Sequence, residues 1–332
     1  MTLQLKVSGL PAFQAPEVII PRLAQKGARV SQVIRHDGAL VFRAEGSVAP
    51  GVYVEEGGKD ARPLVLDSRQ SFHVNPVAAG GLVAVHRGQP GRIPALVEEV
   101  LFIDGETVVM RVPGQTVGVS GDGTTALVAD VPGKTLHRVD LPTRTRTRAA
   151  GFAAGMNPHL APVLALDVNG KRALFMDARE ERCDGSLELL DLESGTVKRL
   201  LGPSPAPSRV CGAFSPSGNM IALEMRVGDT PQFRMLRIQG DEPGAVALKL
   251  EIAEPLSVPA FLDENHVVLP LTLTTHPNAT YGPVELVMVS LVNGTTVPIT
   301  RGGEVRGRAR VEGDAVLLEG GDVVLRIPWR AG

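Results

Sequence analysis

Three polar segments of the sequence, residues 178–184, 226–230 and 275–281, carry side chains well suited to binding another molecule. These side chains are arginines, a tyrosine, a histidine and an aspartate, namely Arg179, Arg182, Arg226, Asp229, His276 and Tyr281. Arginine and tyrosine often anchor interfaces because they combine a large contact area with directional hydrogen bonds. The pattern favours a partner-binding sector, and ordinary solvated loops are the alternative interpretation.

Two histidines, His73 and His159, are the first candidates for a metal site. An imidazole can ligate a divalent metal when further ligands, such as carboxylates, converge on the same ion. The neighbouring inner strands offer mostly small or apolar residues, and a lone histidine is more often a hydrogen-bonded structural residue. We therefore expect no metal and no cofactor, with metal-assisted catalysis as the alternative.

The sequence lacks the spacings of several catalytic motifs. It contains no GxSxG elbow, no HExxH pair and no EF-hand spacing. Residues 121–126 match a loose form of the dinucleotide fingerprint. However, we expect them between two strands of a hairpin, where no helix N-terminus would meet a pyrophosphate. These observations favour a protein that binds without catalysis.

Two runs of alternating arginines could attract an anionic partner. In a strand, period-two geometry would place all three arginines of Thr143–Arg148 on one face. We expect this strand to be outermost, where charge protects an edge or contacts an acidic partner. The second run, Arg306, Arg308 and Arg310, is expected to approach an innermost strand. There it would draw in an anionic ligand, or pair with nearby acids.

The elements that position these residues follow from a repeat. Turns centred on glycine or asparagine recur every 42 to 48 residues, at Gly38, Gly81, Gly123, Gly170, Gly218, Asn265 and Gly313. A period in the forties with short flanking strands is typical of a β-propeller blade. We predict an all-β, seven-bladed β-propeller with four-stranded antiparallel blades. The loops that join second to third strands would then gather on one face, which holds the polar segments together.

We interpret residues 1–332 as a single propeller domain. The predicted repeats lie near residues 30–67, 73–112, 116–150, 160–201, 209–252, 258–300 and 306–328. The last repeat has only three strands, so Leu3–Val7, which alternates apolar and polar residues, is predicted to pair with it and close the ring. Residues 11–27 are predicted to be an ordered connection, since Pro21 argues against a helix over Glu17–Gln25.

Three stretches resemble a known family. They are residues 120–130 (SGDGTTALVAD), 187–201 (LELLDLESGTVKRLL) and 215–225 (SPSGNMIALEM). These stretches resemble the strand–turn–strand and outer-hairpin units of Tol-B-type propellers, which also occur in propeller domains attached to prolyl-oligopeptidase-type peptidases. The resemblance covers repeats three to five. It implies a binding propeller without an attached catalytic domain.

Composition limits the partners and the compartment. The net charge is −2 and the isoelectric point is near 6.4, so no general attraction to nucleic acid or acidic lipid is expected. No apolar stretch approaches the roughly 20 residues of a membrane span. The N-terminus lacks the pattern of a signal peptide, which predicts a cytoplasmic protein, or a periplasmic one if the N-terminus was trimmed. Cys183 and Cys211 are then expected to be free thiols.

Together, the repeat and the polar segments predict a non-catalytic β-propeller scaffold that presents loops to another protein. Arg308 joins the six loop residues as a candidate for partner binding. One alternative is a small-molecule hydrolase or lyase centred on the channel, lactonase-like and metal-assisted. A module that recognises a peptide or a sugar is the other. The partner itself is not identified by the sequence.

Overall fold

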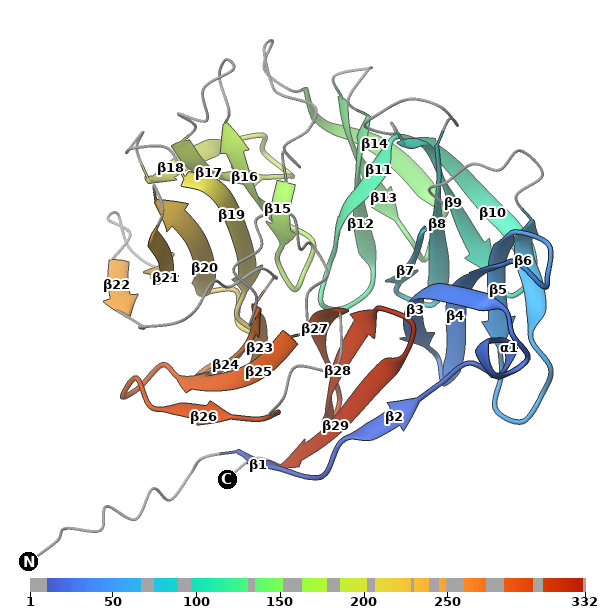
Figure 1. Ribbon diagram of the computed structural model, residues 1–332. Coiled ribbons are helices and arrows are strands. Elements are labelled where there is room, and N and C mark those ends of the chain that lie inside the picture. The colour runs from blue at the N-terminus through green and yellow to red at the C-terminus, as the bar shows by residue number, and fades with distance from the viewer. Residues whose placement is uncertain are drawn as a thin grey trace, which may run out of the picture.

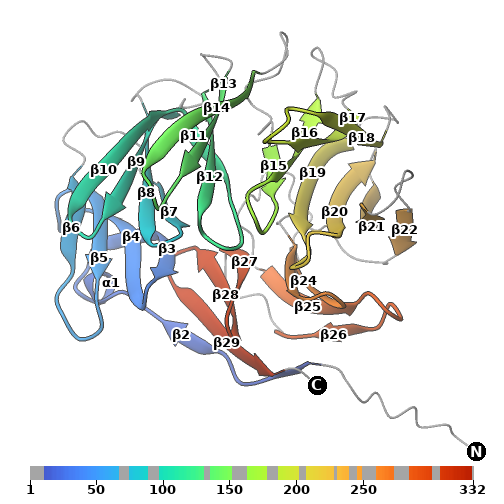
Figure 2. The same cartoon turned by 180° about the vertical axis from the view of Figure 1, so that it is seen from behind.

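The chain folds into twisted antiparallel sheets arranged around a common centre, as Figure 1 shows, with the view from behind in Figure 2. The computed structural model describes residues 11–66, 75–88, 97–130, 135–151, 163–177, 186–201, 207–227, 230–238, 245–248, 259–272, 284–300 and 307–330. Within these ranges, six sheets have four strands each and one further sheet has five.

The first three sheets are each built from four consecutive strands. The first contains β3 (Arg29–His36), β4 (Ala39–Glu45), β5 (Gly51–Glu55) and β6 (Arg62–Leu66). The second contains β7 (Asn75–Ala79), β8 (Leu82–Gly88), β9 (Val97–Asp104) and β10 (Thr107–Pro113). The third contains β11 (Gln115–Val119), β12 (Thr125–Asp130), β13 (Thr135–Asp140) and β14 (Thr145–Gly151).

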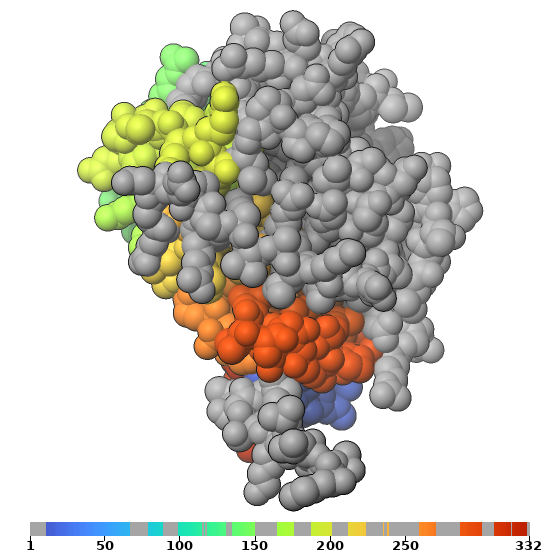
Figure 3. Space-filling view, turned by 90° about the vertical axis from the view of Figure 1, so that its left-hand side faces the viewer, coloured from blue at the N-terminus to red at the C-terminus, as the bar shows by residue number. Residues whose placement is uncertain are grey.

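The next three sheets repeat this arrangement. The fourth contains β15 (Val163–Leu166), β16 (Arg172–Asp177), β17 (Ser186–Asp191) and β18 (Val197–Leu201). The fifth contains β19 (Pro207–Phe214), β20 (Met220–Val227), β21 (Thr230–Arg237) and β22 (Ala245–Leu248). The sixth contains β23 (Ala260–Asp263), β24 (His266–Thr272), β25 (Val284–Ser290) and β26 (Thr296–Pro298). On the side seen in Figure 3, residues of the sixth sheet, in orange, form part of the surface.

The last sheet combines both ends of the described chain. Its three consecutive strands are β27 (Gly307–Glu312), β28 (Ala315–Gly320) and β29 (Val324–Arg330). The other edge of β29 pairs with two short N-terminal strands, β1 (Ala12–Phe13) and β2 (Glu17–Ile19). A single helical turn, α1 (Arg22–Gln25), then leads into the first sheet.

All seven predicted turn residues lie between the first and second strands of a sheet. The turn of the first sheet shows the physical reason, because Asp37 and Gly38 adopt φ angles of 46° and 78°. This left-handed conformation costs glycine little and is tolerated best by Asn and Asp among other residues. The glycine spacing therefore located the first hairpin of each sheet.

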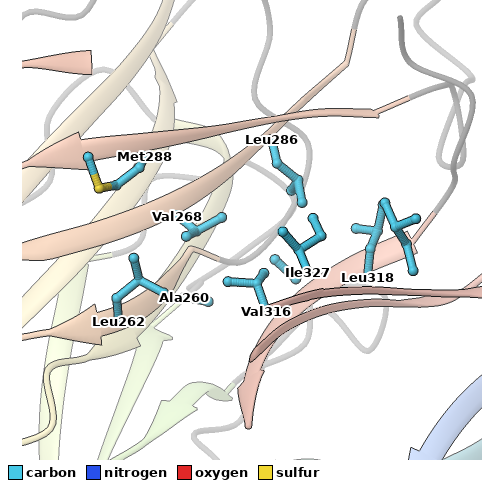
Figure 4. Close-up of a cluster of buried hydrophobic side chains, with 10 residues drawn as sticks. Ala260, Leu262, Val268, Leu286, Met288, Val316, Leu318 and Ile327 are labelled. Carbon is cyan, nitrogen blue, oxygen red and sulfur yellow. The ribbon is translucent and has the colours of Figure 1, made fainter. Parts of the chain in front are cut away.

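The hydrophobic core is divided into clusters that lie between neighbouring sheets. Among the described residues there are seven such clusters, of which Figure 4 shows the one between the sixth and last sheets. There, Val268 and Leu286 face Val316 and Ile327, all four fully buried. Another cluster packs Leu317 and neighbours from the last sheet against the first sheet. Valine, leucine and alanine fill these spaces, as a chain poor in aromatic residues requires.

These findings confirm an all-β propeller with four-stranded antiparallel blades. The number of sheets built from four consecutive strands is six, not seven. The last repeat keeps three strands of its own, as its sequence predicted. The proposed closing strand, Leu3–Val7, lies outside the described residues. Among the described N-terminal residues, the strands that pair with β29 are at 12–13 and 17–19.

The prediction for residues 11–27 was wrong in detail. The segment was predicted to be an ordered connection without a strand or helix, but it contains two strands and the turn of helix α1. Pro21 does not prevent the helix because it occupies the N-cap, where its missing N–H and fixed φ are tolerated. No helix in the described ranges has the length and apolar character needed to cross a membrane.

Candidate functional site

The described strands bound the predicted binding segments at 178–184 and 275–281, whereas the segment at 226–230 begins in β20 and ends in β21. β16 ends at Asp177 before β17 begins at Ser186, and β20 ends at Val227 before β21 begins at Thr230. In the sixth sheet, β24 ends at Thr272 and β25 begins at Val284. Each segment therefore joins a second strand to a third strand, and the three sheets are consecutive. Most of the candidate side chains themselves lie outside the described residues, namely Arg179, Arg182, Asp229, His276 and Tyr281.

Two candidates lie on described backbone. Arg226 is near the end of β20, opposite Arg209 of β19, and Arg308 of β27 is opposite Glu319 of β28. Their side chains are outside what the structure describes, as are His73 and His159 entirely. Over the described residues, no group of three His, Cys, Asp or Glu side chains could hold a metal ion. The metal and cofactor expectations therefore stay predictions.

At the opposite end of the sheets, residues in or next to the turns form contacts between neighbouring sheets. In the fourth sheet, Asp167 is only 2% exposed, and its carboxylate accepts a bond from Arg172 Nε at 2.9 Å. The same carboxylate accepts the backbone N–H groups of Lys171 and Arg172. Arg172 Nη2 then donates to the carbonyl of Gly218 in the fifth sheet at 2.8 Å, and its guanidinium lies 5.9 Å from the ring centre of Phe214. We call this set of contacts the fourth-to-fifth junction.

A second polar contact links the fifth sheet to the sixth. Glu264, in the turn after β23, accepts bonds from the backbone N–H and the hydroxyl of Ser217, the latter at 2.9 Å. Both residues lie in the first turns of their sheets. Consecutive turns are therefore held together at this end of the fourth, fifth and sixth sheets.

Arg310 provides a similar contact between the last sheet and the first. Its Nε donates to Glu319 Oε2 at 2.9 Å, and its Nη2 donates to the carbonyl of Arg35 at 2.9 Å. Glu319 is 7% exposed and also accepts the backbone N–H of Arg35 at 2.6 Å. We call this set of contacts the last-to-first junction. Burial alone would lower the pKa of Arg310, but the hydrogen bonds and charges of Glu319 and Glu312 raise it above its ordinary value.

This arrangement decides between the two interpretations for one member of the second arginine run, since Arg306 and the side chain of Arg308 lie outside the described residues. Arg310 pairs with Glu319 and Glu312, as the alternative prediction for this run proposed, and its other bond goes to the backbone of the first sheet. The first run also differs from its prediction. Arg144 lies in the turn before β14, with a φ of 57°, and donates to Asp104 of the second sheet. Only Arg146 and Arg148 of that run lie on the strand, where both are exposed.

His86 is a titratable residue that the sequence did not single out. It lies in β8, and its Nε2 accepts the backbone N–H of Thr116 in β11 at 3.2 Å, which joins the second sheet to the third. Burial lowers the pKa of His86 to about 4, so the imidazole is neutral at pH 7. The sequence gave no signal of this contact, because one histidine after a continuous apolar run in a strand does not indicate a bond to another sheet.

The described residues also form a pocket of 430 Å³ at the turn end of the first sheet. Its lining comes from the N-terminal segment, from the first sheet and from β29, and we call it the N-terminal pocket. Leu40 and Ile19 supply apolar surface, and Arg22, Arg35 and Arg326 supply cations. Helix α1 lies beside β4 and β5 in Figure 1, and the N–H of Arg22 donates to Glu55 at 2.8 Å.

Comparisons with known proteins identify the fold. No family model matches the chain, and no curated protein matches its sequence. Among solved structures, virginiamycin B lyase from Staphylococcus aureus is similar, with a TM-score of 0.60 and 10% identity over 96% of this chain and 99% of that one. A chain of a mitotic checkpoint complex has a TM-score of 0.59 and 12% identity, over 99% of this chain and 95% of that one.

A prolyl endopeptidase is similar over 92% of this chain but only 49% of its own, with a TM-score of 0.57 and 12% identity. TolB structures are also among the matches, with lower TM-scores. At these identities the similarity concerns the fold alone, and the proteins named have different functions. At that level, the predicted resemblance to the propellers of prolyl-oligopeptidase-type peptidases is confirmed: the chain is a β-propeller with a similar fold.

Proposed function

We propose that the chain is a closed, seven-bladed propeller that acts as a non-catalytic scaffold for another protein. For the blade count, we take the last sheet as the seventh blade, completed by β1 and β2. Two observations support closure. The cluster that contains Leu317 and Phe42 packs the last sheet on the first, and the last-to-first junction adds the buried Glu319 contacts.

The observation that carries the scaffold proposal is the placement of the three polar segments. Each is bounded by the second and third strands of one of three consecutive sheets, so all three begin at the same end of these sheets. The turns at the other end are joined by Arg172 and Glu264. A framework held in this way fixes the strand ends from which the segments start, and binding by rigidly held groups loses less conformational entropy.

In this proposal Arg182, Arg226 and Tyr281 provide the main contacts, with Arg179, Asp229, His276 and Arg308 around them. Arginine offers a planar set of donors that matches carboxylates and backbone carbonyls, and tyrosine adds apolar area with one hydroxyl. The partner is therefore expected to present acidic side chains beside an apolar patch. A peptide or a sugar as the ligand would be an outcome of the same test.

The test compares two triple variants in capture from a lysate of the native host. The first, Arg182→Ala, Arg226→Ala and Tyr281→Ala, should lose a stoichiometric protein partner that the unmodified chain retains. The control, Lys171→Ala, Glu193→Ala and Asn265→Ala, changes exposed turn residues at the opposite end of the fourth and sixth sheets.

Both variants should keep the unfolding temperature of the parent, because all of the changed residues are expected to be outside the core. The proposal predicts that only the first variant loses the partner. Equal retention by both variants would show that the loop sector is not the binding surface. Equal loss would place the binding surface across both ends of the sheets and contradict the proposed sector.

A further inference from the structure

We propose that the N-terminal pocket binds a small organic anion, a carboxylate with a short apolar body, through Arg35. This site lies at the turn end of the sheets, where β3 meets β4 and β5 meets β6, and so goes beyond the loop sector discussed above. Its volume of 430 Å³ is in the range of about 300–1,000 Å³ that is usual for small-molecule pockets.

The charges around this pocket are paired, with one exception. Glu55 accepts the backbone N–H of Arg22 and forms an ion pair with its guanidinium at 4.0 Å, and that guanidinium also donates to the Gly58 carbonyl at 2.9 Å. In the same way, Arg326 lies 3.3 Å from Glu17 and 3.1 Å from Asp314. The opposite charges in these pairs neutralise one another and leave little capacity to bind a charged ligand.

The remaining carboxylate of the lining, Glu56, is also engaged. It forms ion pairs with Lys59 and Arg62, and the hydrogen bond from Lys59 is the main cause that lowers its pKa. A ligand cation would therefore compete with cations that are already in place. For this reason the pocket is not expected to select amines.

Arg35 is the exception. It lines the pocket and is partly buried, and its guanidinium has no hydrogen-bond or ion-pair partner in the part of the chain that the structure describes. Its backbone, in contrast, is held on both sides: the N–H donates to Glu319, and the carbonyl accepts from Arg310. The backbone of Arg35 is thus fixed beside the pocket, while the five donors of its guanidinium stay available.

A planar guanidinium can hold a carboxylate through two parallel hydrogen bonds. The buried Leu40 and the partly buried Ile19 offer apolar contact beside it. Three glycines of the lining, Gly38, Gly57 and Gly58, leave open space where a Cβ would be, with no atom within 4 Å. The pocket therefore has room, one uncompensated cation and apolar surface, which together match an organic carboxylate.

The experiment uses benzoate as the probe, followed by the amide resonances of Gly38, Gly57 and Gly58 in the full-length protein. Benzoate should produce saturable shifts of these resonances. Benzamide, which has the same shape without the charge, should bind at least about tenfold more weakly, because hydrogen bonds to charged partners are about twice as strong as neutral ones. Inorganic phosphate should also bind more weakly than benzoate, since it cannot use the apolar surface.

Three variants sharpen the test. Arg35→Gln removes the guanidinium but keeps the backbone bonds, and should weaken benzoate at least about tenfold. Gly57→Phe should abolish binding, because Gly57 lines the pocket and its φ is outside the left-handed region, so a large side chain is accepted there. Lys26→Gln, which removes an exposed cation that does not line the pocket, should leave the affinity unchanged.

Several outcomes would overturn the proposal: no saturable shift with benzoate, equal affinity for benzamide, or equal affinity for phosphate. Unchanged benzoate binding by Arg35→Gln would do so as well. If that variant failed to fold, Gly57→Phe would still decide the question, since binding that survives in it would place benzoate elsewhere.

Discussion

The fourth-to-fifth junction and the last-to-first junction use the same chemistry at two very different places in the chain. In each, the Nε of an arginine binds a buried carboxylate of its own sheet, and Nη2 of the same side chain binds a carbonyl of the next sheet. The arginines are Arg172 and Arg310. The carboxylates differ, however, in the backbone N–H groups that they also bind.

Asp167 accepts two backbone N–H groups from its own turn, so it stabilises a local structure. Glu319 instead accepts the N–H of Arg35, a residue 284 positions away. The fourth and fifth sheets are adjacent in sequence, whereas the last and first sheets are at opposite ends. Bringing distant residues together costs more chain entropy, although this cost grows only slowly with separation. In the last-to-first junction, which joins residues far apart in the sequence, the carboxylate therefore accepts hydrogen bonds from both sheets.

Removing Arg310 should have the largest effect. Arg310→Ala leaves the buried Glu319 with one backbone donor, and we expect a loss of about 3 kcal/mol in the free energy of unfolding. Urea unfolding would measure it. Glu17→Gln is the control, because it breaks only an exposed pair with Arg326 and should cost less than about 1 kcal/mol. Equal effects of the two variants would contradict the role of the last-to-first junction.

The junction between the second and third sheets offers a test with pH, because it depends on a neutral histidine. His86 has a folded pKa of about 4, below its unfolded value of 6.5, so the unfolded chain binds more protons between these values. Stability is therefore fully present above pH 6.5 and decreases as the pH falls towards 4, by on the order of 3 kcal/mol. The measurement is urea unfolding at pH 7, 5.5 and 4.

His86→Gln keeps an acceptor for the Thr116 N–H but cannot titrate. The difference in unfolding free energy between parent and variant should therefore depend on pH in this window. A constant difference would show that His86 is not held neutral at this junction.

Truncation tests which N-terminal residues complete the last sheet. Deletion of residues 1–20 removes Phe13 and Ile19, which are partly buried against the last sheet and its neighbours, and should cost about 2 kcal/mol. Deletion of residues 1–7 should cost much less, because within the described residues the pairing of the N-terminal segment to β29 begins at Ala12. Thermal unfolding of both proteins would decide. A large loss from the shorter deletion would restore Leu3–Val7 as a closing strand.

Arg172→Ala should have the smallest effect. Asp167 keeps its two backbone donors, and only the Arg172 bonds and the contact with Phe214 disappear. We expect a loss of about 1–2 kcal/mol in urea unfolding. A loss larger than that of Arg310→Ala would reverse the order of the two junctions.

The repeating part of the fold was predictable because its signals are local. A glycine or asparagine turn between short strands requires only neighbouring residues, and it located the first hairpin of all seven repeats. The N-terminal strands gave no such signal. β1 and β2 have two and three residues among prolines, which is too short for alternation to be recognised, whereas Leu3–Val7 alternates clearly.

Contacts between sheets were not predictable for a different reason. The bond from Arg310 to Arg35 joins residues 275 positions apart, and no local pattern specifies such a pair. The sequence therefore suggested that the arginines at 306–310 could line the channel, whereas Arg310 forms a contact between the last and first sheets. Similarly, the repeat placed the polar segments between second and third strands, but what those segments bind depends on side chains whose arrangement the pattern does not specify.

The most direct test of the scaffold proposal is affinity purification of the tagged protein from its native host. Co-purified proteins would be identified by mass spectrometry, and the metal content of the same sample would be measured. The proposal predicts a reproducible protein partner near one-to-one stoichiometry and no stoichiometric metal. A stoichiometric divalent metal without a protein partner would contradict it, and would make His73 and His159 the first residues to replace.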